Sequence, residues 1–479
     1  MNRTWWIRVA AFLVLAVTSN GSASVLINVP GNDLDDNTTQ NEPSISASRS
    51  TIVIGWNNIA EVLTAGVSWV SYAYSTNAGA IWSPPLSLPT VPGGHNSGDP
   101  VIAVDRAGTF YFATLAQDAS GHNFIGVARS SATSPAVTFD VPVLIDRGVT
   151  TAAPDKPWLD VDSTGGKFNG RVYLCWKDMA TKTLRFTRSI SSAAAAPLTF
   201  VSSMALPTST NSSQGCSVAV GTAGEVYVAW VDGWGTTKQT LQIVKSIDGG
   251  DSFGSVVTVA KPLRTGHLVT CSGSRRPVLN GNIRVGDNAV MAVDRSSGSY
   301  NGSVYVAFTS RPVAKSSDES DVLITRSPAD PAAPATGDPG MTWSKPISVH
   351  NAPAINPDAT ANDNWFPAIA VSRATGTVMV TFYDRRMDPA NMKIDLFAAT
   401  SSDGGKTWAD QRITGASFGV PPLRPNFNSL NRDCYMGDYN GVAAWDDNFF
   451  LAWGDNSRSV VNAVFPEGRP DPDVVYEQH

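Results

Sequence analysis

Residues with chemically useful side chains recur at two kinds of position in this sequence. One group comes just before short apolar runs, and it comprises Asp99, Lys156, Asp287, Trp365, Asp433, Tyr435, Asp438 and Tyr439. The other group follows a second kind of apolar run, and it comprises Lys177, Asp178, Asp232, Trp234, Arg311, Asp384, Arg385, Arg386 and Asp455. Aromatic faces suit sugar rings, arginine forks suit carboxylates or sulfates, and a ring of aspartates could hold Ca²⁺ through oxygen ligands. These residue types favour a glycan or an anionic polysaccharide as the partner.

Within these groups, the adjacent Arg385 and Arg386 are the best candidates for holding an anionic group. The expected ligand-binding set is completed by Asp384, Asp438, Asp99, Lys156, Asp178 and Trp365. His95 and His267, each in a loop before an apolar run, are candidate general bases. No cofactor is expected apart from a possible Ca²⁺, and no residue is assigned as a metal ligand.

The elements that must position these residues form a repeat along the chain. Each unit opens with a short apolar run that is usually led by proline. The seven runs begin at Pro43, Pro100, Pro157, Cys216, Ala289, Pro367 and Asn440. A second run that ends in an aromatic residue follows, as at 172–176, 226–230, 304–308, 378–382 and 450–453. Their period-two alternation predicts strands, and further runs such as 395–400 and 344–349 predict a third and a fourth strand in each unit.

The most specific motif of the chain lies between the third and fourth predicted strands. Residues 401–408 read S-x-D-x-G-x-x-W, residues 246–253 end in Phe instead, and residues 75–82 carry Asn77 in place of the aspartate. Altered versions run over 130–139, 189–200 and 327–343. The carboxylate can accept backbone N–H groups of a tight turn, and glycine permits a positive φ. Because the motif recurs once per unit, it predicts a structural turn rather than a binding site.

Four antiparallel strands repeated radially predict an all-β chain folded as a seven-bladed β-propeller. A six-bladed propeller is the alternative, if the last repeat is only a cap. The last unit lacks a fourth strand, and residues 25–30 resemble the other fourth strands. We therefore expect the N-terminal segment to close the last blade, which removes two open sheet edges. The heads of the first strands and the ends of the second strands then meet around the central channel, on the face opposite the motif turns.

With these repeats and motifs, the chain resembles the sialidase-like Asp-box propellers, the bacterial neuraminidase repeat family, over essentially residues 25–479. The resemblance implies a secreted exo-glycosidase of sialidase type. Such enzymes use an arginine triad, an aspartate acid/base and a tyrosine nucleophile assisted by a glutamate. Asp438-Tyr439 loosely matches the family's tyrosine stretch, so Tyr439 is the implied nucleophile. Glu42-Pro43 stands where the family carries the first arginine of an R-I-P motif.

Three function classes therefore remain open. Tyr439 favours a sialidase-type glycoside hydrolase, and Glu42 in place of arginine argues against one. A non-catalytic propeller that binds a glycan or a protein would need only the charged and aromatic rim. A polysaccharide lyase on the same fold would need a general base, such as a histidine or a tyrosine.

The start of the chain predicts export from the cytoplasm. Arg3 and Arg8 flank a tryptophan pair, residues 9–17 are apolar, and Ser22-Ala23-Ser24 resembles a cleavage site. Residues 1–24 are therefore predicted to be a signal peptide, and residues 25–479 a single secreted or periplasmic domain. Such a short apolar run cannot span a bilayer, and no membrane span is expected elsewhere. A net charge of −6 without a basic cluster argues against nucleic acid as a partner. We expect a monomer.

The four cysteines permit disulfides in an exported chain. Cys175 lies in an apolar strand pattern and is predicted to be a buried thiol. Any disulfide is predicted to involve Cys271, with Cys434 or Cys216 as its partner, because these three lie at the rim end of the units. The spacing shows no C-x-x-C pair, so no zinc site is expected.

Overall fold

A computed structural model describes residues 24–28, 40–58, 68–131, 136–190, 197–271, 274–312, 318–328, 338–350, 362–420, 434–461, 466 and 468–479. The predicted signal peptide, apart from Ser24, and Asp433 lie outside these residues. The described part of the chain contains no helix long and apolar enough to cross a membrane.

Short antiparallel strands dominate the structure, and seven of its sheets have four strands each among the described residues. Sheet 1 contains β2 (Gln40–Ser48), β3 (Thr51–Asn58), β4 (Val70–Ser75) and β5 (Leu86–Ser87). Sheet 2 contains β6 (His95–Val104), β7 (Phe110–Gln117), β8 (Asn123–Arg129) and β9 (Val143–Leu144). Sheet 3 contains β10 (Pro154–Val161), β11 (Val172–Asp178), β12 (Thr183–Arg188) and β13 (Met204–Ala205). Sheet 4 contains β14 (Gln214–Val220), β15 (Val226–Asp232), β16 (Thr240–Ser246) and β17 (Val257–Ala260). Sheet 5 contains β21 (Ala289–Val293), β22 (Val304–Ser310), β23 (Asp321–Ser327) and β24 (Ile347–Ser348). Sheet 6 contains β25 (Asn364–Val371), β26 (Val378–Asp384), β27 (Asp395–Ser401) and β28 (Ala409–Arg412). Sheet 7 contains β29 (Gly441–Trp445), β30 (Asn448–Val460), β31 (Arg469–Gln478) and β1 (Val25–Leu26).

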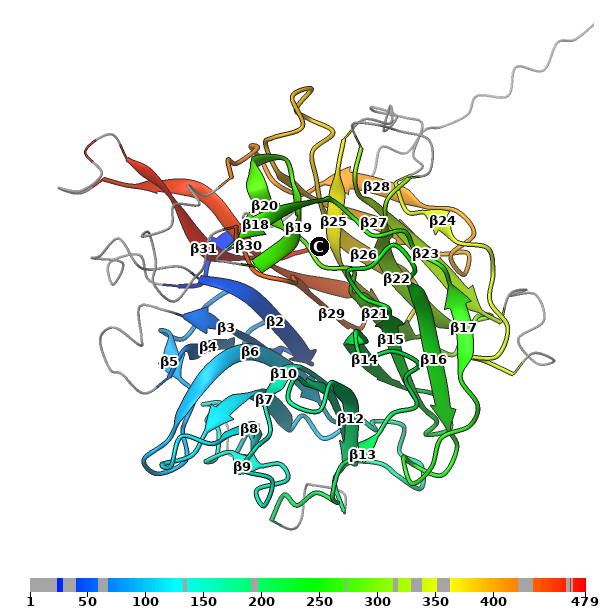
Figure 1. Ribbon diagram of the computed structural model, residues 1–479. Coiled ribbons are helices and arrows are strands. Elements are labelled where there is room, and N and C mark those ends of the chain that lie inside the picture. Colours follow the sequence, from blue (N-terminus) through cyan, green and yellow to red (C-terminus); the bar gives the residue numbers. More distant parts are fainter. Residues whose placement is uncertain are drawn as a thin grey trace, which may run out of the picture.

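The first strands of the seven sheets form a closed ring. Each contacts the first strand of the next sheet, in the order β2, β6, β10, β14, β21, β25 and β29, and β29 returns to β2 (Figure 1). This arrangement is a β-propeller, and the all-β prediction is confirmed. We call the end of the ring where the first strands begin the rim face, and the end where they finish the turn face.

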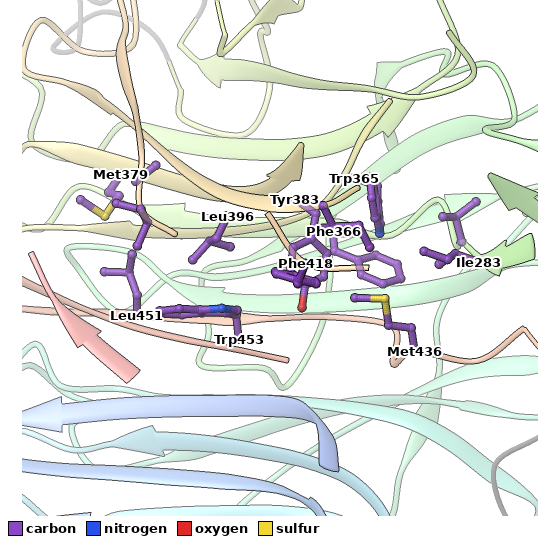
Figure 2. Packing of buried hydrophobic residues seen from close by; sticks show 14 of the residues in the cluster. Ile283, Trp365, Phe366, Met379, Tyr383, Leu396, Phe418, Met436, Leu451 and Trp453 are labelled. Atoms are coloured by element: carbon purple, nitrogen blue, oxygen red, sulfur yellow. The ribbon is translucent and has the colours of Figure 1, made fainter. Parts of the chain in front are cut away.

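The core lies between neighbouring sheets, which explains why the second strands are apolar on both sides. All seven residues of β11, β15, β22 and β26 are buried. Figure 2 shows one such layer, in which Trp365, Tyr383 and Leu396 of sheet 6 pack with Leu451 and Trp453 of sheet 7. Packing on both faces favours uninterrupted apolar strands over strict alternation.

Sheet 7 is completed by the first and last strands of the described residues. Val25 and Leu26 pair with Tyr476 and Val475 of β31. Ile27 is buried, and its backbone N–H donates to the Val474 carbonyl at 2.9 Å. The predicted closure by the N-terminal strand is confirmed for these residues, while residues 29 and 30 of the predicted strand lie outside the described part.

The two turns with a complete serine and aspartate motif are held by the carboxylate, as the sequence predicts. Asp403 accepts the backbone N–H groups of Lys406 and Thr407 at 2.9 and 3.0 Å, and the hydroxyl of Ser401 at 2.8 Å. Asp248 accepts the equivalent bonds in its own turn. Although partial burial opposes it, this hydrogen bonding lowers the pKa of each carboxyl to about 2. These aspartates are therefore satisfied within their turns.

Two disulfides connect parts of the fold that are distant in sequence. Cys271 pairs with Cys434, as predicted for one of its two candidate partners. Cys175 pairs with Cys216 across sheets 3 and 4, which corrects both the expectation of a buried free thiol and the expectation that any disulfide would involve Cys271. The side chain of Cys175 is fully buried, but the neighbouring first strand brings Cys216 within 6.3 Å between Cα atoms. Both bonds fit an oxidising compartment.

An eighth sheet was not predicted. The residues between sheets 4 and 5 fold into β18 (His267–Cys271), β19 (Ser274–Leu279) and β20 (Ile283–Arg284), with a single 3₁₀ turn (η2, Asn280–Asn282) between the last two. Ile283 packs against the sheet 6 and 7 core, near Phe366 and Met436 (Figure 2). The Cys271–Cys434 disulfide joins this inserted sheet to the segment that leads into β29.

The closure of sheet 7 makes Ile27 a testable contributor to stability. Replacing Ile27 by Ala should lower the free energy of unfolding by about 2–4 kcal/mol, because the buried side chain leaves a cavity. Val25→Ala is the matched control, two residues earlier in β1, and Val25 is 36% exposed. Denaturant unfolding of both variants measures the difference, and equal effects would contradict the closure.

The turn carboxylates should contribute to stability and not to ligand recognition. Asp403→Ala should lower the free energy of unfolding at pH 7 by about 1–3 kcal/mol, since charge-assisted hydrogen bonds are lost. Because the folded pKa of about 2 lies below the unfolded one, the contribution is present above about pH 4 and is lost as the pH falls toward 2. Asp447→Ala, at an exposed aspartate of another turn, is the control. Melting curves between pH 3 and pH 7 test this, and a constant difference would count against it.

Candidate functional site

The head of the first strand carries a bulge in most of the sheets. The pairing register shifts at Asn41/Ser44, Gly98/Val101, Asp155/Trp158 and Trp365/Ala368. At each of these four bulges, one residue directly before a proline adopts a positive φ: Glu42 (54°), Asp99 (55°), Lys156 (53°) and Phe366 (52°). Such a conformation costs about 1–3 kcal/mol for a residue with a side chain, and it is concentrated at functional sites in proteins. Three of these four strained residues are ionisable.

Glu42 forms a hydrogen-bonded pair with a tyrosine from the other end of the chain. The Tyr435 hydroxyl donates to Glu42 Oε1. Asn57 Nδ2 donates to Glu42 Oε2 at 2.8 Å, and Asn57 Oδ1 accepts the backbone N–H of Asp99 at 3.0 Å. Asp99 Oδ2 in turn accepts the backbone N–H of Lys156 at 3.0 Å. One continuous polar chain therefore crosses the heads of sheets 1, 2 and 3.

Asp438 is the centre of a second, cationic part of the cluster. Its Oδ2 lies 2.6 Å from Arg284 Nη2 and 3.3 Å from Lys156 Nζ. The Arg284 guanidinium lies over the Tyr435 ring, 4.3 Å from its centroid, and Lys156 Nζ lies 5.1 Å from the centroid of Tyr439. Arg284 comes from the inserted sheet, so that sheet completes the cluster.

The pKa values of the carboxyl groups in the cluster are shifted in opposite directions. Against the effect of burial, Arg284 and Lys156 lower the pKa of Asp438. Burial raises the pKa of Asp99 well above its usual value, and the Glu42 carboxylate raises it further. Burial and Asp438 also raise the pKa of Glu42. Neighbouring carboxyl groups whose pKa values are driven apart are typical of acid–base sites.

A cavity of about 250 Å³ opens beside this cluster on the rim face. Lys156, Arg284 and Asp438 belong both to the cluster and to the cavity wall. Trp234, Lys177 and Arg276 line the wall as well. Trp234 is half-buried, and its indole N–H is buried without a partner among the described residues. The cavity thus offers an aromatic residue and several cationic groups.

Four of the predicted site residues meet in this cluster, namely Asp99, Lys156, Asp438 and Tyr439. Tyr439 contributes its ring to the wall between sheets 3 and 7, in edge-to-face contact with Trp158. Its hydroxyl, which was expected to attack a sugar, donates to the Pro100 carbonyl at 2.9 Å. The residue is 8% exposed. Tyr435, four residues earlier, carries the hydroxyl that faces a carboxylate.

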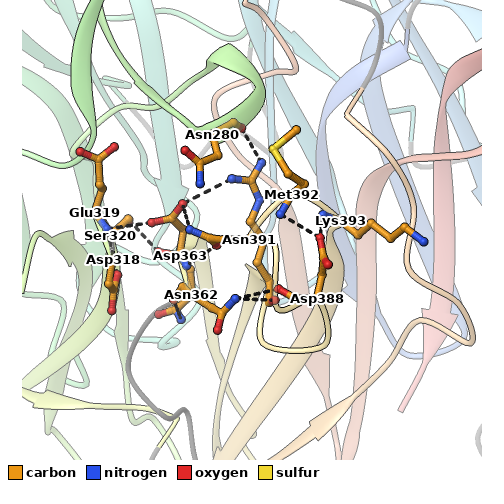
Figure 3. A network of polar contacts seen from close by, with 12 residues as sticks. Asn280, Asp318, Glu319, Ser320, Asn362, Asp363, Asp388, Asn391, Met392 and Lys393 are labelled. Atoms are coloured by element: carbon orange, nitrogen blue, oxygen red, sulfur yellow. Dashed lines mark hydrogen bonds and ion pairs between the residues drawn. The ribbon is translucent and has the colours of Figure 1, made fainter. Parts of the chain in front are cut away.

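The arginine pair is not exposed at the rim, which corrects the expectation for Arg385 and Arg386. Arg385 is fully buried and lies 3.3 Å from Asp363, and Figure 3 shows Asp363 within its network beside Asn391. Burial lowers the pKa of Arg385 to about 10. The Arg386 guanidinium forms ion pairs with Asp384 and Asp410. Strand β26 is packed on both faces, so the residues that end it are covered by neighbouring loops.

The remaining predicted residues also have structural partners. Trp365 is fully buried under the Arg385 guanidinium, 4.9 Å from it. Asp178 accepts the backbone N–H groups of Ala153 and Ala180. Among the described residues no three His, Cys, Asp or Glu side chains are grouped so that they could hold a metal ion. His267 pairs with Glu319, outside the rim cluster.

Sequence reasoning missed Glu42 and Arg284 as members of the site. Glu42 had a usable signal, because it occupies the same pre-proline position as Asp99 and Lys156. Arg284 had none, since it lies in an insertion without any repeat counterpart. Tyr435 stood among the predicted rim residues, but its partner is 393 positions away in sequence.

Strand pairing and the rim cluster define the chain as a β-propeller with a buried, charged site at one mouth of its channel. No family model matches the sequence, and no curated protein matches it. Similar solved structures include an ulvan lyase described as a new family of polysaccharide lyase, with 11% identity, a TM-score of 0.49, and coverage of 90% of this chain and 93% of that one. A leech intramolecular trans-sialidase has 10% identity, a TM-score of 0.46, and coverage of 83% and 70%. A Penicillium chrysogenum α-L-arabinanase has 13% identity, a TM-score of 0.45, and coverage of 76% and 93%.

Removal of the central carboxylate should destabilise the rim cluster. Asp438→Asn leaves Arg284 and Lys156 without their shared partner, so the free energy of unfolding at pH 7 should fall by roughly 3 kcal/mol. Because the folded pKa of Asp438 lies below its unfolded value, the difference from wild type should shrink as the pH falls below about 4.

Asp251→Asn is the matched control, since it breaks an ion pair with Arg188 in which the aspartate side chain is 51% exposed. This control should cost less than about 1 kcal/mol. Urea unfolding at pH 7 and pH 3 provides the measurement. A loss as small as that of the control would show that the buried ion pairs do not hold the rim together.

Proposed function

We propose that the protein is a glycoside hydrolase that acts on an acidic sugar at the rim cluster. In this proposal Tyr435 is the nucleophile, Glu42 its general base, and Asp99 the general acid. The observation that carries the proposal is the hydrogen bond from the Tyr435 hydroxyl to Glu42, beside a cavity with cationic walls.

The tyrosine requires its glutamate partner. Burial, Glu42 and Asp438 raise the pKa of Tyr435 well above the usual value of a phenol, so a free phenolate is not available at neutral pH. Glu42 must therefore accept the phenolic proton as the oxygen attacks, and its own raised pKa makes it a stronger base. A carboxylate that activates a hydroxyl by direct hydrogen bonding is the arrangement that nucleophilic catalysis needs.

Asp99 has the properties of the acid that protonates the leaving group. Its raised pKa keeps the carboxyl protonated to a higher pH than an ordinary aspartate. In the first step Tyr435 Oη bonds to the anomeric carbon while Asp99 gives its proton to the departing glycosidic oxygen. In the second step water cleaves the glycosyl–tyrosine bond, Asp99 takes a proton from the water, and Glu42 returns the phenolic proton. Two displacements retain the anomeric configuration.

The choice of an acidic sugar follows from the cavity wall. Arg276 and Arg284 present guanidinium forks, which suit carboxylate and sulfate groups. Trp234 offers an aromatic face to a sugar ring. Asp438 forms ion pairs with Arg284 and Lys156, whereas Arg276 and Lys177 line the same cavity without an ion pair among the described residues.

A comparison of two tyrosine variants tests the proposal. The wild-type protein is assayed with 4-methylumbelliferyl glycosides of acidic sugars, namely sialic, glucuronic and iduronic acid. Tyr435→Phe should lower kcat by roughly 10³-fold or more, since the nucleophile is removed. Tyr439→Phe, which loses only a hydrogen bond to a backbone carbonyl, should stay within about tenfold of wild type and cost about 1 kcal/mol of stability.

The acid adds an independent check within the same assay. Asp99→Asn should slow glycosides of poor leaving groups far more than the methylumbelliferyl substrates, because the latter need little protonation. Loss of activity in Tyr439→Phe with full activity in Tyr435→Phe would overturn the assignment. Binding of acidic glycans without turnover of any substrate would show a non-catalytic propeller instead.

A further inference from the structure

Three arginines gather at the opposite mouth of the channel, on the turn face. They lie in the turns that follow the first strands of sheets 2, 5 and 6, two residues after each strand ends. The three arginines are Arg106, after Asp105; Arg295, after Asp294; and Arg373, after Ser372. The equivalent position in sheet 3 is Ser163, after Asp162. Ring closure brings these four turns together, although Arg106 and Arg373 are 267 positions apart in the sequence.

The guanidinium groups converge on a single hydroxyl. Ser163 Oγ accepts a hydrogen bond from Arg373 Nη2 and another from Arg295 Nη1 at 3.3 Å. Arg106 Nη1 donates to the Thr164 carbonyl at 3.4 Å. The Ser163 oxygen thus accepts two hydrogen bonds, and the residue is buried. The positive charge of Arg295, together with burial and Arg106, lowers the pKa of Arg373 to about 9.

The nearby carboxylates do not form ion pairs with these arginines. Asp105, Asp162 and Asp294 accept backbone N–H groups of their own turns, at 2.8 Å from Ala107, Thr164 and Ser296. Asp160 accepts the backbone N–H groups of Val161 and Val220 at 2.8 and 2.9 Å. Within the described part of the chain, no carboxylate lies within ion-pair distance of Arg106, Arg295 or Arg373.

The three arginines line a cavity of about 260 Å³ that follows the channel between the first strands. Asp105 and Asp160 line it too, and Trp158 and Tyr439 lie in its wall toward the rim. This volume exceeds by several fold the roughly 30 Å³ that a water molecule occupies, so a small polyatomic ion fits beside the arginines.

We propose that this mouth of the channel is a binding site for a tetrahedral oxyanion, sulfate or phosphate, held by Arg106, Arg295 and Arg373. Converging guanidinium groups without carboxylate partners match the several oxygen acceptors of such an anion. The site lies at the other end of the channel from the rim cluster and does not depend on the function proposed there. The ligand chemistry is shared by a free oxyanion and by the sulfate group of a sulfated glycan.

Isothermal titration and melting curves test the proposal with sodium sulfate, sodium phosphate, glucose 6-sulfate and, as a salt control, sodium chloride at equal ionic strength. Sulfate or phosphate should bind to wild type and raise its melting temperature more than chloride does. Arg295→Gln and Arg373→Gln should each weaken binding by roughly tenfold or more, since a charge-assisted contact is lost. Without sulfate or phosphate, Arg373→Gln should melt no lower than wild type, because it relieves repulsion between guanidinium groups.

The matched control is Arg49→Gln. Arg49 follows Ser48 at the end of β2, the equivalent turn position in sheet 1, but it is exposed and lies outside the cavity wall. Its removal should leave anion binding unchanged. Binding of glucose 6-sulfate but not inorganic sulfate would assign the site to a sulfated glycan, and binding of the inorganic ions would assign it to a free oxyanion. Equal anion binding by Arg49→Gln and Arg373→Gln, or unfolding of Arg373→Gln in chloride alone, would overturn the proposal.

Discussion

Ring closure is the constraint on which the rest of this structure depends. Each first strand must pack against the first strands of both neighbouring sheets, and the ring closes only where β29 meets β2. The outer edge of sheet 7 is completed by Val25 and Leu26, so the first and last strands of the described residues meet in one sheet. An open edge at this point would expose unpaired backbone groups and the side of a core layer.

Closure also gathers polar residues at both ends of the channel. Seven strand heads point toward one axis on the rim face, and seven strand ends do so on the turn face. At the rim, the strain of the positive φ at Glu42, Asp99 and Lys156 is offset by the hydrogen bonds and ion pairs that these residues form. At the turn face, the positive charge of Arg295 lowers the pKa of Arg373, and the carboxylates of Asp160 and Asp162 offset this lowering only in part. The two mouths therefore differ in electrostatic character.

The inserted sheet shows how a departure from the repeat adds chemistry to it. Its strands place Arg284 against Asp438 and Tyr435, and a disulfide ties Cys271 to Cys434 at the start of the same segment. The Arg284 backbone N–H donates to the Cys434 carbonyl at 2.6 Å. The short segment 434–439 is thus held from one side by the insertion and from the other by Glu42 and the Pro100 carbonyl.

The sequence by itself determined the strands, the turns and the four-strand unit, because these depend on alternation, proline and glycine within a few residues of one another. It also placed Asp99, Lys156, Asp438 and Tyr439 near the channel axis, since their position relative to each first strand is local. Only the tertiary structure decided which of these groups pair, because Glu42 and Tyr435 meet through closure of the whole ring. It likewise decided that Arg385 is buried and that Cys175 finds Cys216, since burial and disulfide pairing depend on the neighbouring sheet and not on the strand that carries the residue.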